Sequence, residues 1–173
     1  MPVCEMELQK AETVPPKQPL RVCFVCTGNT CRSPMAAAVA NVLAREQGKE
    51  PTLVAVSAGL YAVEGEPISP CAAKALARAG FLPQGGAEAV AHRAHTLTDA
   101  DVTAADLLVG ISGGHCMELL LRFPQAATRI TAMPEPIADP YGGDEETYVA
   151  CLAEIVKGVR RLLFSADGEG GAE

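Results

Sequence analysis

The chain has 173 residues, of which 49% are hydrophobic and 20% are charged, and 14 Lys and Arg against 21 Asp and Glu give a net charge of −7. This balance predicts one globular domain with a sizeable core rather than a disordered chain, and it argues against a nucleic-acid partner. The sequence shows neither an apolar run of bilayer length nor an apolar N-terminal leader, so we expect no membrane association and no secretion.

Predicted strands and helices alternate through residues 20–164, which we assign as the domain, between a flexible extension at 1–19 and a flexible acidic tail at 165–173. The expected elements, in chain order, are a strand at 20–26, a helix at 34–47, a strand at 53–57, a helix at 71–79, a strand at 107–111, a helix at 115–121, a strand at 129–131 and a helix at 145–164. Gly48 and Gly80 follow the first two helices as C-terminal stops. This alternation predicts an α/β fold, a parallel sheet with helices on both faces.

Seven cysteines are scattered along the chain, an odd number that does not resemble a disulfide scaffold: Cys4, Cys23, Cys26, Cys31, Cys71, Cys116 and Cys151. They predict a reducing, cytoplasmic location. Cys23 and Cys26 have the spacing of half a zinc site, but no second Cys or His pair completes it, so we expect no metal. We interpret Cys23, Cys71, Cys116 and Cys151 as core residues.

The turn between the first strand and the first helix reads Cys26-Thr-Gly-Asn-Thr-Cys-Arg-Ser-Pro34. Ligands bind at such turns in parallel α/β folds. The turn is neither a Walker loop nor a dinucleotide-binding fingerprint. Gly28 and Asn29 tolerate the left-handed conformations that turn successive N–H groups inward, which predicts a phosphate cradle.

Other residues of this turn predict a nucleophile at the base of the cradle. Ser33 is expected to cap the helix, and Pro34 suits its first position. Arg32 can bind two phosphate oxygens with its planar guanidinium. Cys26 faces the positive concavity, so we expect it to attack as a thiolate. A second Cys-x5-Arg spacing, at 116–122, lies in a helical pattern without glycine and cannot form such a loop.

Two further motifs follow in the chain: Ser57-Ala-Gly59 after the second strand and Asp139-Pro-Tyr141 before the last helix. Together with the turn at 26–34, they resemble the low-molecular-weight protein tyrosine phosphatase family over nearly all of residues 20–164. The resemblance implies a four-stranded parallel sheet, a cysteinyl-phosphate intermediate, a phosphorylated protein as substrate, and no metal or other cofactor.

The resemblance also implies the catalytic residues. Cys26 is the nucleophile, Arg32 is the transition-state clamp, and Asp139 is the general acid that later becomes the base. A carboxyl group suits the last role, because the leaving atom must gain a proton and the attacking water must lose one. Without the other motifs, an Asp before a proline would be interpreted as a turn residue.

The supporting residues follow in the same way. The phosphate-binding loop comprises Thr27, Gly28, Asn29, Thr30, Cys31, Arg32 and Ser33. Ser33 matches the family serine that stabilises the thiolate, and Asn29, Ser57 and His92 match a supporting hydrogen-bond network.

Cys31 lies in the same loop as the nucleophile. The resemblance implies a reversible redox role, a Cys26–Cys31 disulfide that protects the nucleophile from over-oxidation. The alternative is a small buried residue that packs under the loop.

Thr30 occupies a position where most tyrosine-specific members carry Ile or Leu, and it is similar to the bacterial branch that acts on protein arginine. Only Tyr61 and Tyr141 are available as aromatic walls of the substrate pocket. The acidic residues at 144–146 either attract a guanidinium group or begin a helix. We therefore favour phosphoarginine over phosphotyrosine by a small margin, and we expect activity on aryl phosphates.

Two other classes are the alternatives. A related thiol-dependent arsenate reductase uses the same loop but needs two further cysteines on a mobile segment, and none lies between residues 80 and 105. A non-catalytic phosphate-binding module would lack the acid, whereas Asp139 is present. We expect the enzyme to be a monomer.

Overall fold

The computed structural model describes residues 18–48, 52–82 and 91–165, so the predicted flexible ends lie almost wholly outside the described residues. Within these ranges the chain forms a sheet with the strand order β2-β1-β3-β4, in which every pair is parallel. The strands are β1 (Leu20–Cys26), β2 (Leu53–Gly59), β3 (Leu107–Gly110) and β4 (Ile130–Ala132). The predicted four-stranded parallel sheet is confirmed.

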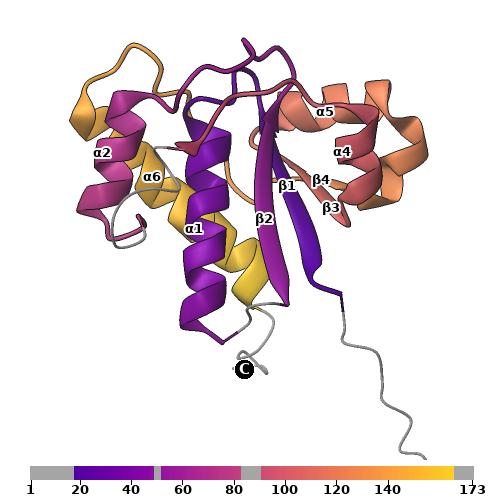
Figure 1. Ribbon diagram of the computed structural model, residues 1–173, viewed down its shortest axis with the longest axis horizontal. Coiled ribbons are helices and arrows are strands. Elements are labelled where there is room, and N and C mark those ends of the chain that lie inside the picture. The colour runs from indigo at the N-terminus through magenta and orange to yellow at the C-terminus, as the bar shows by residue number, and fades with distance from the viewer. Residues whose placement is uncertain (1–17, 49–51, 83–90, 166–173) are drawn as a thin grey trace, which may run out of the picture.

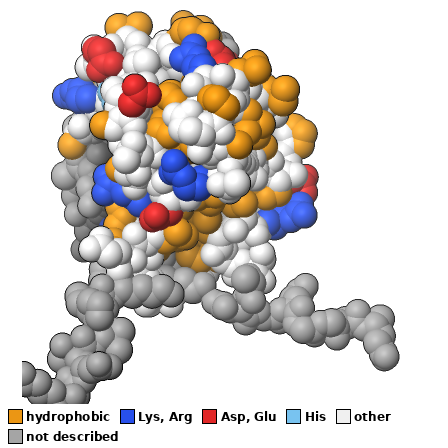
Figure 2. Space-filling model, turned by 90° about the vertical axis from the view of Figure 1, so that its right-hand side faces the viewer, with side chains coloured by type: hydrophobic (Ala, Val, Ile, Leu, Met, Phe, Trp, Pro, Cys, Tyr) orange, Lys and Arg blue, Asp and Glu red, His pale blue; other side chains and the backbone are white. Residues whose placement is uncertain are grey.

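Helices cover both faces of this sheet, as predicted (Figure 1). One face carries α1 (Arg32–Glu46), α2 (Pro70–Arg78) and α6 (Glu145–Val159). The other carries α4 (Asp99–Ala104), α5 (Gly113–Arg122) and the 3-10 helix η1 (Pro124–Arg129). Figure 2 looks onto the side of α4 and α5, where acidic and basic side chains are mixed among hydrophobic ones. No helix in the described ranges is both long enough and apolar enough to cross a bilayer.

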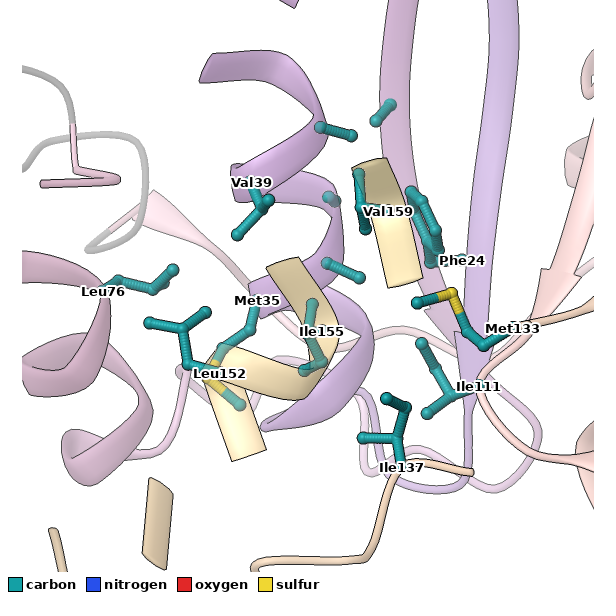
Figure 3. Packing of buried hydrophobic residues seen from close by; sticks show 14 of the residues in the cluster. Phe24, Met35, Val39, Leu76, Ile111, Met133, Ile137, Leu152, Ile155 and Val159 are labelled. Atoms are coloured by element: carbon teal, nitrogen blue, oxygen red, sulfur yellow. The ribbon is translucent and has the colours of Figure 1, made fainter. Parts of the chain in front are cut away.

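β1 lies between β2 and β3, and the side chains on both of its faces are buried. Phe24 is fully buried in the larger core, where it belongs to one cluster with Met35 of α1 and Ile155 of α6 (Figure 3). Val25, the next residue, is fully buried in the smaller core, with Leu119 of α5. Burial on both faces explains why β1 is a continuous apolar run rather than an alternating one.

The helix boundaries differ from the prediction in ways that matter for the site. α1 begins at Arg32, two residues before the predicted start, and Cys31 takes the N-cap position without a side-chain cap. Ser33 is therefore inside the first turn, and the prediction that it caps the helix is wrong. Gly48 and Gly80 do end their helices, with φ of 66° and 79°.

Two further differences lie away from the site. The predicted last helix divides into α6 and a π-helical turn, η2 (Arg160–Phe164). α4 was not predicted, because six residues are too few to show a helical period. Its start is nevertheless marked by a capping box between Thr98 and Asp101, in which each side chain accepts the other residue's backbone N–H.

Candidate active site

The carboxyl ends of the strands bring the predicted loop against its supports. Cys26, at the end of β1, is in register with Gly59 of β2, and Val25 is in register with Gly110 of β3. The loop after β1 surrounds a pocket of about 230 Å³. Its lining residues are Cys26, Thr27, Gly28, Asn29, Thr30, Cys31, Arg32, Glu66, Asp139 and Tyr141.

Cys26 lies at the base of this pocket and is only 3% exposed. Its Sγ is 2.9 Å from Ser33 Oγ, at hydrogen-bonding distance. Asn29 Nδ2 donates to the same Ser33 Oγ at 2.9 Å, so Ser33 keeps its own proton to donate. Its two acceptors are the sulfur at 2.9 Å and the Ala58 carbonyl at 3.5 Å, of which the sulfur is the nearer. A thiolate has no proton to donate, so Cys26 in that form accepts this hydrogen bond from Ser33 Oγ.

Asn29, Ser33 and Cys26 form the buried inner wall of the pocket, and Asn29 lies at its centre. It is fully buried and has a φ of 57°, the left-handed conformation that Asn tolerates better than most residues. Its Nδ2 also donates to Ser57 Oγ at 2.9 Å, and its Oδ1 accepts the backbone N–H of His95 at 3.1 Å. The predicted left-handed conformation is wrong for Gly28, since Asn29 alone in this loop has a positive φ.

His92 supports the same residue from outside the loop. Its Nε2 lies 2.7 Å from the backbone carbonyl oxygen of Asn29. A carbonyl oxygen only accepts, so His92 carries a proton on Nε2. Burial lowers the pKa of His92, against a smaller opposite effect of this hydrogen bond, so the neutral ring is favoured.

Gly59 of the Ser-Ala-Gly motif lets the end of β2 approach the loop. A Cβ at Gly59 would lie 2.7 Å from the Thr27 carbonyl oxygen and 3.1 Å from Asn29 Cβ. The same Thr27 carbonyl accepts the Tyr61 N–H at 2.9 Å. The motif therefore supplies both the Ser57 hydroxyl and the close backbone contact that holds the loop.

Arg32 and Asp139 meet at the other side of the pocket. Arg32 Nη2 is 3.4 Å from Asp139 Oδ2, and Arg32 Nη1 donates to the Ile137 carbonyl at 3.5 Å. The Arg32 side chain is 9% exposed and that of Asp139 is 57% exposed. Asp139 Oδ1 also accepts the Tyr141 N–H at 3.1 Å, which orients the carboxylate above the loop. The carboxylate is thus both fixed and accessible to solvent.

The rim of the pocket, which Thr30, Glu66, Asp139 and Tyr141 line, differs from the predicted set of substrate-pocket residues. Thr30 and Tyr141 line it, as expected, and Tyr141 is 82% exposed. Tyr61 is not among the lining residues, because its hydroxyl donates to Glu118 and the Arg122 guanidinium stacks on its ring at 4.7 Å. Glu66, which no motif marked, lines the pocket instead.

Cys31 packs beneath the loop. It is 7% exposed, and its Sγ is 3.4 Å from the hydroxyl of Tyr148 on α6. Burial, with the Cys31 contact, raises the pKa of Tyr148 to about 12, so the phenol stays neutral. This is the packing role considered for Cys31; its redox role stays a prediction.

The other cysteines in the described ranges are free thiols of varying burial. Burial raises the pKa of Cys23 to about 12 and that of Cys151 to about 11, so neither becomes a thiolate near neutral pH. Cys71 and Cys116 are half-buried. The described ranges contain no cluster of three or more Cys, His, Asp or Glu side chains arranged to hold a metal ion.

One neighbour of the loop was missed from the sequence. His115, on α5, places Nε2 at 2.9 Å from Thr27 Oγ1. The two residues are 88 positions apart, and His115 belongs to no motif that the sequence analysis identified. The only local signal is its place three residues after Ser112, within the first turn of the helix.

Comparison with known proteins agrees with this geometry. A family profile described as Low molecular weight phosphotyrosine protein phosphatase matches residues 21–170. The chain is 36% identical over 151 residues to a protein-arginine-phosphatase of Geobacillus stearothermophilus, covering 83% of this chain and 94% of that protein. It is 32% identical over 159 residues to a low molecular weight protein-tyrosine-phosphatase of Streptomyces coelicolor, covering 84% and 92%.

A solved structure gives the same result for the fold. The crystal structure of a low molecular weight protein tyrosine phosphatase from T. tengcongensis superposes with a TM-score of 0.75 at 34% identity, covering 83% of this chain and 97% of that one. Because the profile and these relatives span nearly the whole described fold, including the loop that starts at Cys26, the chain belongs to the low molecular weight phosphotyrosine protein phosphatase family, whose members are cysteine-based hydrolases acting on phosphorylated proteins.

Proposed function

We propose that this phosphatase works through Cys26 as nucleophile, Arg32 as transition-state clamp and Asp139 as general acid and base. The observation that carries the proposal is the pocket itself. Cys26 Sγ, with Ser33 Oγ at 2.9 Å, shares one small pocket with the Arg32–Asp139 pair. Cys31 lines the same pocket, but its Sγ packs beneath the loop against the Tyr148 hydroxyl at 3.4 Å. The other cysteines in the described ranges do not line the pocket.

In the first step, the Cys26 thiolate attacks phosphorus and forms an S–P bond. The bond between phosphorus and the leaving oxygen or nitrogen breaks, and protonated Asp139 gives its proton to that atom. The partly exposed carboxyl group of Asp139 suits this role, since it can reach the leaving group above the loop. The product is dephosphorylated protein, with phosphocysteine on the enzyme.

In the second step, a water molecule attacks the phosphocysteine. Asp139, now a carboxylate, takes a proton from the water, the S–P bond breaks, and inorganic phosphate leaves with the thiolate restored. In both steps the equatorial oxygens carry negative charge. The Arg32 guanidinium and the N–H groups of the loop are the donors that stabilise it.

The test uses the two Cys-x5-Arg spacings of the chain as a matched pair. Cys26→Ser is expected to abolish turnover of phosphorylated peptides, whereas Cys116→Ser, at the spacing inside α5, is expected to retain it. Rapid acid quench of the wild type should trap a phosphoenzyme whose label is on the peptide containing Cys26. Turnover by Cys26→Ser, or label on another residue, would show the mechanism to be wrong.

We propose phosphoarginine as the preferred substrate over phosphotyrosine. Thr30 and Glu66 line the pocket and give it a polar and acidic character, while Tyr141 is its one lining aromatic side chain among the described residues. A guanidinium group suits an acidic mouth, whereas a phenyl ring needs apolar walls. The relative from Geobacillus stearothermophilus bears the name protein-arginine-phosphatase, which supports the same choice.

Matched peptides test this preference. We expect a higher kcat/KM for phosphoarginine than for phosphotyrosine peptides, and Thr30→Ile is expected to reverse the order. Cys26→Ser is the blank. A phosphotyrosine preference in the wild type would refute the substrate proposal and leave the cysteine mechanism standing; no turnover of either would refute both.

We also propose that the enzyme acts as a monomer in the cytoplasm. The six described cysteines are free thiols, the state that a reducing compartment maintains. Sedimentation equilibrium should give a mass near 18.0 kDa. A mass of a dimer would contradict the first part, and recovery of the protein outside the cytosolic fraction would contradict the second.

A further inference from the structure

His115 lies at the third position of α5 and is 8% exposed, yet the mechanism above does not use it. It joins the helix to the phosphate-binding loop. On one side of the ring, Nε2 is 2.9 Å from Thr27 Oγ1. On the other side, Nδ1 is 3.2 Å from the Ser112 backbone nitrogen and 2.8 Å from Ser112 Oγ.

The hydrogen bonds determine which ring nitrogen carries the proton. The Ser112 N–H can only donate, so Nδ1 of His115 must be an acceptor without a proton. A neutral ring with a bare Nδ1 has its proton on Nε2. The His115 Nε2–H therefore donates to Thr27 Oγ1.

This assignment decides what the Thr27 hydroxyl does. Its oxygen accepts from His115, so its own proton is free to be donated elsewhere. Thr27 lines the phosphate pocket, and its backbone is held by the Tyr61 N–H on its carbonyl. With the backbone and the hydroxyl oxygen both fixed, the hydroxyl proton can be directed at a phosphoryl oxygen.

The charges around His115 favour the neutral ring that this arrangement requires. Burial is the largest cause that lowers the pKa of His115, and the Arg32 guanidinium lowers it further. The carboxylates of Glu118 on the same helix and Asp139 across the pocket act in the opposite direction but less strongly. A protonated ring would also place an N–H against the Ser112 N–H, and so lose that hydrogen bond.

We propose that His115 is a positioning residue that, through its Nε2–H, sets the Thr27 hydroxyl as an additional donor to the phosphoryl group of the substrate. The inference rests on the proposed function, because it assigns the phosphate to the pocket beside Cys26. It adds a side-chain hydroxyl of the loop, held from outside the loop by His115, to the donors that the loop backbone and Arg32 provide. It also connects α5 to substrate binding.

Two conservative variants separate positioning from folding. In His115→Asn the amide oxygen can take the place of Nδ1 and accept the Ser112 N–H, but nothing reaches Thr27. In His115→Gln the longer amide can donate to Thr27 Oγ1 but does not restore the bond to Ser112. His115→Asn therefore keeps the hydrogen bond at the start of α5 and loses the one to Thr27. His115→Gln keeps the hydrogen bond to Thr27 and loses the one at the start of α5.

The experiment measures the KM of a phosphopeptide, the Ki of inorganic phosphate and the melting temperature for each variant. Because a hydrogen bond to a charged group is involved, we expect His115→Asn and Thr27→Val each to raise KM and Ki about tenfold. The double variant should add little to either change, since both remove the same donor. His115→Gln should recover most of the phosphate affinity despite a lower melting temperature.

Two results would overturn the inference. The first is a Ki of inorganic phosphate in His115→Asn or in Thr27→Val that equals the Ki of the wild type. The second is a loss of phosphate affinity that parallels the loss of melting temperature, so that His115→Gln binds phosphate more weakly than His115→Asn. Either result leaves the proposed function intact provided that the wild type turns over phosphopeptides through Cys26. Lack of turnover in the wild type would count against the proposed function instead.

Discussion

The inner wall and the rim of the pocket are built in different ways. The inner wall is buried, with Cys26, Asn29 and Ser33 between 0% and 3% exposed and joined by hydrogen bonds of 2.9 Å. At the rim, the Asp139 side chain is 57% exposed and Tyr141 is 82% exposed. A buried polar network holds one geometry, whereas exposed side chains can vary without loss of the fold. In the proposed mechanism, the inner wall therefore holds the attacking sulfur in one geometry, and the rim meets the leaving group.

Asp139→Asn is the variant expected to have the largest effect among rim changes. It keeps the acceptor for the Tyr141 N–H but removes the transferable proton, so kcat should fall about 10² to 10⁴-fold. The fall should be smaller for an aryl phosphate with an acidic phenol, which leaves without protonation. Stopped-flow assays with phenols of graded pKa measure this. An equal fall for every leaving group would mean that Asp139 does not act as the acid.

Asn29 tests the inner wall. Asn29→Ala removes the donor to Ser33 and Ser57 and also places Ala at a φ of 57°, so we expect about a 10²-fold loss of kcat/KM and a lower melting temperature. Asn29→Gly is the matched control, since glycine accepts this φ but also lacks the amide. Both variants should lose activity alike on all substrates, while Asn29→Gly unfolds at the higher temperature. Losses of activity that differ from one substrate to another would contradict the expectation that the inner wall acts alike on all substrates.

Part of the pH dependence of stability follows from His92. Its folded-state pKa lies below the ordinary value near 6.5, so as the pH falls the unfolded chain binds the proton first. The contribution of His92 to the free energy of unfolding therefore decreases as the pH falls from about 6.5 to the folded pKa, with a slope of at most about 1.4 kcal/mol per pH unit for this half-buried ring. His115, whose pKa burial also lowers, adds a dependence of the same sign. Urea denaturation at pH 8, 7, 6 and 5.5 measures it. His92→Gln, whose amide can still donate to the Asn29 carbonyl, should flatten this part of the curve; an unchanged slope would assign the dependence to other groups.

The sequence predicted the wall better than the rim, for a physical reason. Cys26, Asn29, Arg32 and the rest of the cradle are consecutive, so the residue types needed for phosphate binding appear together as one motif. The contact of His115 with Thr27 depends on how α5 packs against β3 and β4, and it leaves no local pattern.

Residue type alone also misled the interpretation. Ser33 has the side chain of an N-cap, but its hydroxyl lies between Cys26 and Asn29 instead. Tyr61 was expected at the pocket because it is aromatic and follows the Ser-Ala-Gly motif, yet Glu118 and Arg122 hold it elsewhere. Both errors arise because a side chain has several possible partners and only the tertiary packing chooses among them.

Glu66 offers the smallest but most selective change. Its carboxylate lies at the rim without a hydrogen-bond or ion-pair partner among the described residues, while its backbone carbonyl accepts the Ala94 N–H at 2.8 Å. Since exposed ion pairs contribute little, Glu66→Gln should lower kcat/KM for phosphoarginine peptides about two- to fivefold and leave phosphotyrosine peptides unchanged. The effect should shrink at high ionic strength.

Glu64→Gln is the control for this prediction. Glu64 lies two residues away, accepts the Thr96 N–H at 2.7 Å and does not line the pocket, and a glutamine oxygen can keep that hydrogen bond. It removes the same charge from the same loop, so a general loss of negative potential would affect both variants equally. A selective effect of Glu66→Gln would place the guanidinium beside that carboxylate and make the rim the origin of substrate choice. Equal effects, or a loss for phosphotyrosine as well, would exclude Glu66 as the origin of substrate choice and leave Thr30 as the lining residue to change.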